Sequence, residues 1–366
     1  MKLNVNTDKN RINYIDNIRS LVILLLFPFH TFRMFTHFEP FYVQGEPQAF
    51  CDVFIAATSI WFMNILFVLA GISISFSLKK RTIKEFLLER ITKLLIPFIF
   101  GVLLTIPIQT YYAEKFHNNY QGGYMEQLRL YFTKETDLSG YFGGFTPAHL
   151  WFLLFLFLIS ILSLPVIIYV KKNGLPQLKK SPSLIRIIPW FLVIMLSSVV
   201  ELGESLGQYM AYFLLGYLLL QREEVLLLLK RYKWRLTGIA VLLSTTSVVT
   251  YLTLDWSKVN EAVEMGVSAL RHLSSWMIIL TLLGLSQCYL NFRNRITTYI
   301  NKNSFSIYFV HQTILIVIGY YTVRVISTTV VQMFVIMFGT FSSSILACEV
   351  LKRIPVVRTM FGMENK

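Results

Sequence analysis

The chain has 366 residues, of which 55% are hydrophobic and only 15% are charged. A soluble domain of this length does not need so much apolar surface, and the 30 Phe and 19 Tyr suit the aromatic belts of a protein that crosses a membrane repeatedly. The net charge is +14. The basic residues fall in short clusters between apolar runs, without an aromatic-lined groove, and this pattern argues against nucleic-acid binding.

Apolar segments of spanning length recur along the chain. They predict an all-α polytopic membrane protein with about ten transmembrane helices in a single domain, residues 1–366. Segments 184–201 and 207–221 are the weakest candidates, because a helix needs about 20 residues to cross the hydrocarbon core. The expected spans lie near residues 15–35, 53–78, 94–112, 148–170, 184–201, 207–221, 236–254, 267–290, 304–324 and 329–351.

Charged residues alternate between the connecting segments. Most of the 34 Lys and Arg fall in every second connection, whereas acidic residues concentrate in the others. By the positive-inside rule, this predicts an even number of spans with both termini in the cytoplasm, in a multi-pass protein of the cell (inner) membrane. The longest connection, residues 113–147, is expected on the outer side. Its glycines and aromatic residues suit either a plain loop or one that covers a cavity or contacts a sugar.

Common soluble-enzyme motifs are missing. The chain has no Walker A, HExxH or GxSxG motif and no GxGxxG after a strand, which argues against nucleotide-binding, zinc-protease and serine-hydrolase chemistry. Cys51, Cys288 and Cys348 are scattered among apolar segments, so neither a disulfide framework nor a metal site is predicted. Polar residues inside the spans are therefore the first functional candidates.

Three ionisable residues share one face of the first expected span. Asp16 lies three residues before Arg19, and His30 lies eleven residues after it. Eleven residues make just over three full turns, about 16.5 Å along a helix axis. Ionisable groups in a membrane helix are unfavourable unless they line a cavity or pair together, which makes His30 a candidate general base. The alternatives are an interfacial anchor at Arg19 and a histidine that a neighbouring helix satisfies.

A second polar stripe lies on the expected ninth span. Ser304, Tyr308 and His311 occupy positions i, i+4 and i+7, and so share one helix face. His311 is about 10 Å into its helix, at mid-membrane depth. We therefore expect His311 close to His30 in a central cavity. The alternative is a stripe that only joins helices by hydrogen bonds.

Further candidates lie near the expected membrane interfaces. His149 and Trp151 begin the fourth span on the outer side, where an aromatic belt is also expected. Glu201 ends the fifth span and is either a ligand for a sugar hydroxyl or a solvated helix end. Arg90 and Lys93 lie at the inner interface. They are either topology signals or a site for the phosphates of a cytosolic donor such as coenzyme A, which arginine binds in bidentate fashion.

Several fragments resemble the acyltransferase 3 family of integral membrane proteins. Arg19 and His30 match the R-x10-H element of that family's first span, and Asp16 matches the acidic residue that often precedes it. FVLAGISIS at 67–75 is similar to the family's second span, and RITKLLIP at 90–97 to the basic segment that begins its third.

The ordered fragments also resemble the branch of this family that succinylates osmoregulated periplasmic glucans. The similar fragments are YIDNIRSLVILLLFPFH at the front, HLWFLL at 149–154, SFSIYFVHQ at 304–312 and KRIPVVRTMFG at 352–362. The chain departs from that branch at Gln312, where the branch tends to have a second histidine followed by proline.

The resemblance implies transfer of an acyl group, usually acetyl or succinyl, from an acyl-CoA-type donor in the cytosol. The expected acceptor is a hydroxyl of a glycan or another exported molecule, with membrane lipids as further partners and no bound cofactor. His30 would act as the base and Arg19 would hold donor phosphate, oriented by Asp16. His311 would be a second acid/base group or, preferably, donate a hydrogen bond to the thioester carbonyl.

The remaining candidates divide between donor and acceptor. On the donor side we expect Arg90, Lys93, Tyr308 and Ser304, and on the acceptor side His149, Trp151 and Glu201. The main alternative function is a proton-coupled transporter or flippase for a glycan or lipid, because buried His and Arg also suit proton coupling. No inverted internal repeat is detectable, which lowers that alternative. A non-catalytic scaffold would not need buried ionisable residues.

Overall fold

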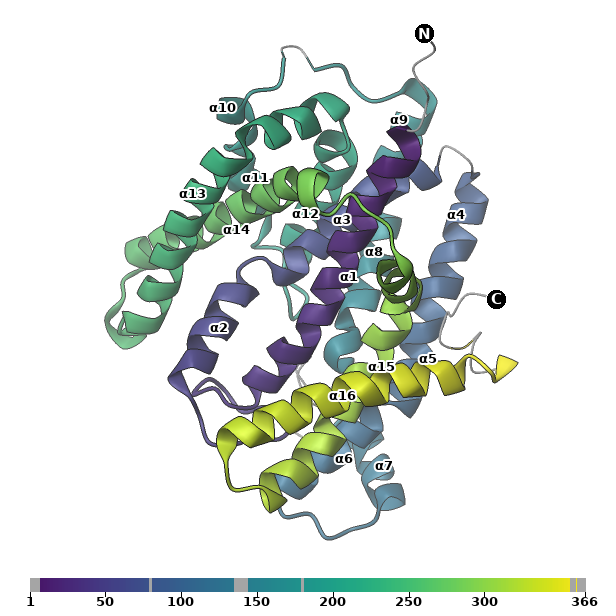
Figure 1. The fold of residues 1–366 in the computed structure, drawn as a ribbon, viewed down its shortest axis with the longest axis vertical. Coiled ribbons are helices and arrows are strands. Elements are labelled where there is room, and N and C mark those ends of the chain that lie inside the picture. The colour runs from purple at the N-terminus through teal and green to yellow at the C-terminus, as the bar shows by residue number, and fades with distance from the viewer. Residues whose placement is uncertain (1–6, 79–80, 135–143, 179–180, 356–359, 361–366) are drawn as a thin grey trace. The chain divides into compact units, whose positions relative to one another are not determined.

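The structure, a computed structural model, describes residues 7–78, 81–134, 144–178, 181–355 and 360. These residues form helices and no strand, apart from an isolated bridge between Leu202 and Glu204 (Figure 1). The expected all-α polytopic fold is confirmed. Two predicted features fall partly outside the described residues: the loop at 113–147, through its residues 135–143, and the C-terminal motif at 352–362.

Seven helical segments among the described residues are long and apolar enough to cross a membrane. They are Asn13–Arg33, Ala49–Ser77, Ile83–His117, Glu223–Thr253, Glu261–Tyr289, Arg295–Val325 and Thr329–Leu351. An eighth is a bent pair, Ala148–Leu162 with Leu164–Asn173, whose axes differ by 50°. Pro165 explains the bend, because it has no N–H to donate to the preceding turn.

The two weakest expected spans correspond to shorter apolar helices, Leu184–Ser197 and Leu206–Leu220. The second rises only about 22 Å, less than the hydrocarbon core of about 30 Å. The structure therefore has seven or eight membrane-length segments within the described residues, and the count of ten depends on whether these two shorter helices also cross.

The chain divides into two compact units, each built from segments that are distant in sequence. The first unit comprises Met1–Val22, Ala56–Phe86 and Ile159–Asn301. The second comprises Ile23–Ile55, Leu87–Leu158 and Lys302–Lys366. Five helices contribute residues to both units: α1 (Thr7–Arg33), α2 (Ala49–Ser59), α4 (Ile83–Arg90), α8 (Trp151–Leu162) and α15 (Arg295–Val325).

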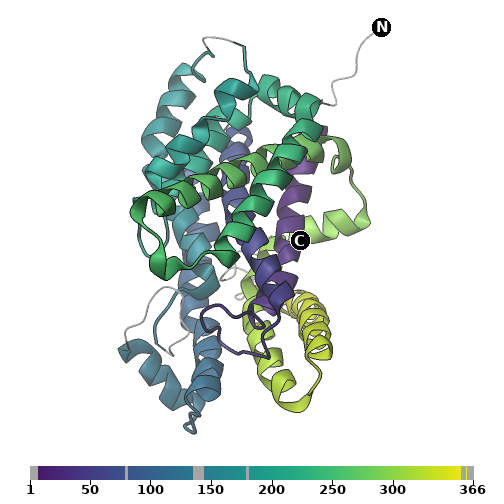
Figure 2. The same cartoon turned by 90° about the vertical axis from the view of Figure 1, so that its left-hand side faces the viewer.

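In the first unit the longest helices, α13 (Glu223–Thr253) and α14 (Glu261–Tyr289), lie side by side (Figure 1 and Figure 2). A second group packs α3 (Phe62–Ser77) against α12 (Leu206–Leu215) and the π-helix η3 (Gly216–Leu220) that continues it. The other elements of this unit are α9 (Leu164–Asn173), α10 (Leu184–Ile187), α11 (Trp190–Ser197) and η4 (Trp256–Lys258).

Two glycines bring the backbones of α3 and α12–η3 into direct contact. A Cβ on Gly71 would lie 2.0 Å from the carbonyl oxygen of Phe213, and a Cβ on Gly216 would lie 2.3 Å from that of Val68. Small residues allow such an approach between membrane helices, and any side chain here would force the helices apart. Gly71 belongs to the fragment FVLAGISIS noted in the sequence.

We expect Gly71→Val to destabilise the protein by about 1–3 kcal/mol or more, because the added atoms meet backbone rather than a movable side chain. The measurement is the thermal unfolding midpoint of the detergent-purified variant. Gly238→Val on α13 is the matched control, since nothing lies within 4 Å of a Cβ at that position. Equal midpoints for the two variants would contradict the close-contact account.

The second unit contains a π turn inside its helical run. η1 (Ile91–Leu95) joins α4 to α5 (Ile96–Leu104), and Pro97 lies in the first turn of α5. Pro97 cannot donate to the carbonyl of Lys93, and its ring crowds that carbonyl, so the wider turn accommodates it. The remaining elements are α6 (Ile106–His117), α7 (Tyr124–Thr133), η2 (Ala148–Leu150) and α16 (Thr329–Leu351).

Gly101 allows α5 to approach η2 and α15. A Cβ at Gly101 would lie 2.2 Å from Cδ1 of Leu150 and 2.7 Å from Cζ of Phe309. Leu150 follows His149, and Phe309 is two residues before His311. The packing at this glycine therefore fixes the two backbone segments that carry these histidines.

Candidate active site

Three histidines from three elements of the second unit meet in its interior. The ring centroids of His30 on α1 and His311 on α15 are 5.2 Å apart, and those of His149 on η2 and His311 are 5.3 Å apart. The expected proximity of His30 and His311 is confirmed. His149, expected at the outer end of the fourth span as an acceptor-side residue or a belt residue, is buried and lies against His311.

The protonation pattern of His311 follows from its hydrogen bond. Its Nδ1 lies 2.6 Å from the carbonyl oxygen of Tyr308, which can only accept, so Nδ1 carries the proton and donates. In the neutral ring Nε2 then holds a lone pair. His311 is fully buried, and its Nε2 has no hydrogen-bond partner among the described residues. At Nε2, therefore, this tautomer can accept a hydrogen bond but cannot donate one.

His30 also has a ring nitrogen that makes no hydrogen bond to the described residues. Its Nδ1 is also buried and has no partner within the described part of the chain. The ring stacks on Phe41 with centroids 6.0 Å apart, and the residue keeps partial exposure, whereas His311 has none. Two buried imidazole nitrogens on neighbouring rings thus lack partners in the described part of the chain. Catalytic hydrogen bonds are often long or poorly aligned without substrate.

His149, by contrast, has partners on both ring nitrogens. Nε2 lies 3.2 Å from the carbonyl oxygen of Phe309 and so donates to it, while Nδ1 lies 3.4 Å from Nε2 of Gln109. The hydroxyl of Tyr308 donates to the main-chain carbonyl of His149. These bonds suit His149 to position His311 rather than to react.

Backbone strain lies beside this cluster. Ala148 has φ +44°, in the left-handed region that a non-glycine residue rarely adopts. Its N–H donates to Oγ1 of Thr146 at 3.0 Å, which helps to hold the turn. Such strain persists where the surrounding contacts over-determine a conformation, often at functional sites.

A glutamine network that the sequence analysis did not identify adjoins the histidines. Gln109 on α6 donates to Oγ1 of Thr313 at 2.7 Å and accepts from Nε2 of Gln312 at 3.2 Å. Oε1 of Gln312 is buried without a partner among the described residues. The sequence does contain a signal for this network. Gln109 and Gln312 both lie inside apolar segments, and a buried amide side chain needs hydrogen-bond partners.

A separate polar group in the first unit is centred on Arg19. Its Nη1 lies 3.0 Å from Oδ1 of Asp16, which confirms the expected pairing, and its Nη2 donates to Oγ of Ser73 at 2.8 Å. Ser73 in turn donates to the carbonyl of Leu69 at 2.6 Å. Both charged side chains are just over a third exposed. Ser73 was not identified from the sequence, because its contact depends on how α3 packs.

The other predicted residues are less closely organised. Lys93, in the π turn η1, pairs with Glu89 at 2.9 Å, and Arg90 ends α4. Ser304 is buried one turn before Tyr308 on α15. Trp151 begins α8 and packs edge-to-face on Phe155, while Glu201 is exposed in the connection between α11 and α12.

No arrangement for a metal ion occurs in the described residues, where no three His, Cys, Asp or Glu side chains are grouped to hold one. All three cysteines are free thiols.

Comparison with known proteins assigns the family. The family model of the acyltransferase 3 domain, described as an acyltransferase domain, matches residues 12–349. This range includes all three histidines and the Asp16–Arg19 pair. No curated protein and no solved structure matches the chain. The match covers most of the sequence, and the chain therefore belongs to the acyltransferase 3 family, as a multi-pass membrane acyltransferase.

Proposed function

We propose that this membrane acyltransferase moves an acetyl or succinyl group from a cytosolic acyl-CoA-type donor to a hydroxyl of an extracytoplasmic glycan or similar exported acceptor, in the cell (inner) membrane. The proposal rests mainly on one observation: Nδ1 of His30 and Nε2 of His311 are both buried and without partners among the described residues, and they belong to rings whose centroids are 5.2 Å apart.

These two atoms complement one another. Nε2 of His311 can only accept, and Nδ1 of His30 donates if it carries the proton. With the ring centroids 5.2 Å apart, rotation of the rings can bring these two atoms within the usual hydrogen-bond distance of about 2.7–3.2 Å. The proton on Nδ1 leaves the lone pair of His30 on Nε2, where it can serve as a base. His311 then acts as a positioning residue that fixes this tautomer, much as a carboxylate does in a catalytic triad.

The reaction follows from that arrangement. Nε2 of His30 takes the proton of the acceptor hydroxyl while its oxygen attacks the thioester carbonyl. The C–S bond then breaks, an ester forms, and the thiolate leaves and receives the proton. This assignment keeps His30 as the expected base. It replaces the hydrogen bond from His311 to the thioester carbonyl, because His311 has no N–H at Nε2 in this tautomer.

The donor needs groups that bind phosphate. Arg19 is suited to this role, since its bonds to Asp16 and Ser73 fix the orientation of the planar guanidinium and leave further N–H groups to donate. Arg90 and Lys93 are proposed for the same donor, with Tyr308 and Ser304 on the donor side of His311. His149, Trp151 and Glu201 remain the proposed acceptor-side residues.

Resemblance to the glucan-succinylating branch favours a succinyl group and a glucan acceptor. Gln312 stands where that branch tends to have a histidine, and its unpartnered Oε1 can accept from a substrate hydroxyl or N–H. An acceptor sugar with a second hydroxyl or an amide beside the hydroxyl that is acylated would supply a hydrogen bond to Oε1 of Gln312.

Mass spectrometry of surface glycans tests the function. Cells that express the protein are expected to carry glycans heavier by one acetyl or one succinyl group than cells that lack it. Expression of His30→Ala should abolish this mass difference. A change in glycan abundance across the membrane, with no change in glycan mass, would instead identify a transporter or flippase and contradict the proposal.

A further inference from the structure

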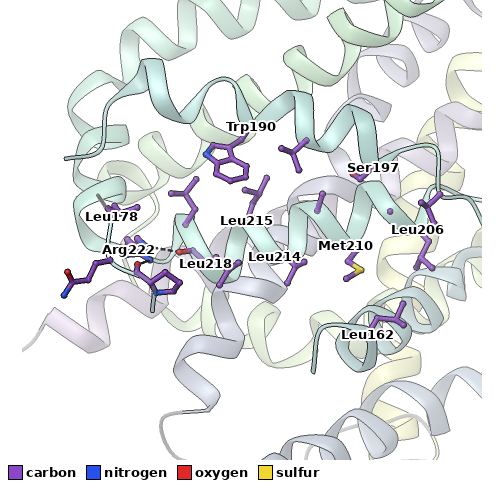
Figure 3. A pocket seen from close by; sticks show the side chains of 17 residues that line it. Leu162, Leu178, Trp190, Ser197, Leu206, Met210, Leu214, Leu215, Leu218 and Arg222 are labelled. Carbon is purple, nitrogen blue, oxygen red and sulfur yellow. Dashed lines mark hydrogen bonds between the residues drawn. The ribbon is translucent and has the colours of Figure 1, made fainter. Parts of the chain in front are cut away.

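An apolar pocket of about 610 Å³ lies within the first unit. Its lining includes no residue of the histidine cluster or of the polar group around Arg19. It is formed by α11, by α12 and η3, by Leu162 at the end of α8, and by residues 176–178. Figure 3 shows it as an elongated space along α12 and η3, with Arg222 and Leu178 at one end and Leu206 at the other. Its volume falls in the range of about 300–1,000 Å³ that encloses small ligands.

The shape of the pocket has a local cause. At one end α11 and α12 are in close contact, because a Cβ on Gly207 would lie only 2.0 Å from the carbonyl oxygen of Ser197. Ser205 reinforces this end by donating to the carbonyl of Ser198 at 2.9 Å. Trp190 and Val193, further along α11, line the space between this helix and α12–η3. The pocket is thus a wedge that closes at Gly207.

The lining is apolar except for Ser197, Gln177 and the charged Arg222. The Arg222 side chain bonds the carbonyl oxygens of Leu218, through Nε at 2.8 Å, and Pro176, through Nη2 at 2.5 Å. Nη1 has no hydrogen-bond partner among the described residues, and the residue is partly exposed. A guanidinium fixed by two carbonyls at the end of an apolar channel can bind an anion such as phosphate.

From this geometry we propose that the pocket binds one anionic phospholipid, with an acyl chain along α12–η3 and its phosphate at Arg222. The membrane surrounds this part of the chain with such molecules. α11 and the turn that follows it also carry strongly exposed apolar side chains, Leu196 at 71% and Val199 at 79%, as expected for a segment that faces lipid. The positive-inside rule puts Arg222 on the cytoplasmic side, where anionic headgroups attract basic residues.

Charge at one end and apolar walls elsewhere together favour a phospholipid over other occupants. A second protein helix would need a wide apolar groove rather than a wedge closed at Gly207. A free anion would leave the apolar part of the pocket empty, and a neutral lipid would make no use of Arg222. The anionic phospholipid satisfies both parts of the site.

Native mass spectrometry of the full-length, delipidated protein tests the site. Phosphatidylglycerol and phosphatidylcholine with identical chains are the probes. We expect one phosphatidylglycerol to remain bound per protein, with about tenfold weaker binding of phosphatidylcholine. Both lipids carry a phosphate, but the choline cation of phosphatidylcholine repels the guanidinium of Arg222 and offsets the attraction of that phosphate; a tenfold difference corresponds to about 1.4 kcal/mol. Arg222→Gln should reduce phosphatidylglycerol binding to the phosphatidylcholine level. Ala211→Trp, which fills the pocket, should remove both.

Matched variants control for surface lipid. Arg235→Gln changes an exposed arginine on α13, and Val199→Trp enlarges an exposed residue outside the pocket lining, so both should bind like the wild type. Equal retention of the two lipids by the wild type, or retention of phosphatidylglycerol by Ala211→Trp, would overturn the proposal.

A measurement on the wild type keeps the proposal testable if a pocket variant fails to fold. Phosphatidylglycerol with a photoreactive group in its chain should label peptides within residues 206–222, and excess unlabelled phosphatidylglycerol should suppress that labelling more strongly than phosphatidylcholine does. Labelling spread evenly over the exposed helices would overturn the site.

Discussion

His30→Ala is expected to lower acyl transfer by about 10²- to 10⁴-fold, because it removes the base that takes the hydroxyl proton. The protein should still insert and fold, since His30 makes no hydrogen bond through its buried Nδ1 among the described residues. The measurement is turnover of the purified variant with an acyl-CoA donor and a defined acceptor. Turnover near the wild-type value would exclude His30 as the base.

Variants of His311 separate its positioning role from that of a base. His311→Ala should lower kcat with little change in KM for either substrate. His311→Gln keeps an acceptor close to the position of Nε2, and it should recover part of that loss. His30→Gln should stay inactive, because an amide cannot take a proton. Equal inactivity of His311→Gln and His311→Ala would instead assign proton transfer to His311.

Arg19→Lys is the second change with a large expected effect, although it conserves charge. Arg19 bonds Asp16 and Ser73 through two different nitrogens, and a single ammonium cannot reproduce both bonds and also bind phosphate. Loss of one or two charge-assisted hydrogen bonds of about 1.5–3 kcal/mol corresponds to a roughly ten- to hundredfold fall in kcat/KM for the donor. Donor-dependent kinetics measure this fall.

Arg33→Lys on the same helix is the matched control. Nη1 of Arg33 donates to Oγ1 of Thr36, a bond that an ammonium can approximate. This variant should keep donor kcat/KM within a few-fold of the wild type. If Arg19→Lys also kept its activity and donor affinity, Arg19 would be a topology anchor and not a donor ligand.

Local patterns predicted one pair within a helix and the common depth of two histidines on different helices. Asp16 and Arg19 pair as their spacing required, and the depth of His30 and His311 in their spans anticipated that their rings meet. Helix periodicity and hydrophobic length determine both features, so a sequence contains them directly.

Contacts between helices were not predictable in the same way. Ser73 and Gln109 face their partners only because particular helices pack together, as at Gly71 and Gly101. The contact of His149 with His311 was missed for a related reason: His149 lies on the short turn η2, and only the packing of that turn against α15 brings the two rings together. The number of spans could not be fixed from the sequence, because two apolar helices, Leu184–Ser197 and Leu206–Leu220, are of marginal length for crossing a membrane.

The contact between α3 and α12–η3 also constrains motion. Because Gly71 and Gly216 leave no layer of side chains between the two backbones, these helices cannot slide past one another without raising main-chain repulsion. Ser73, which holds Arg19, is two residues beyond Gly71 on the same rigid pair. Any rearrangement during turnover must therefore carry α3 and α12 together. Amides along their shared contact should exchange with solvent among the slowest in the chain.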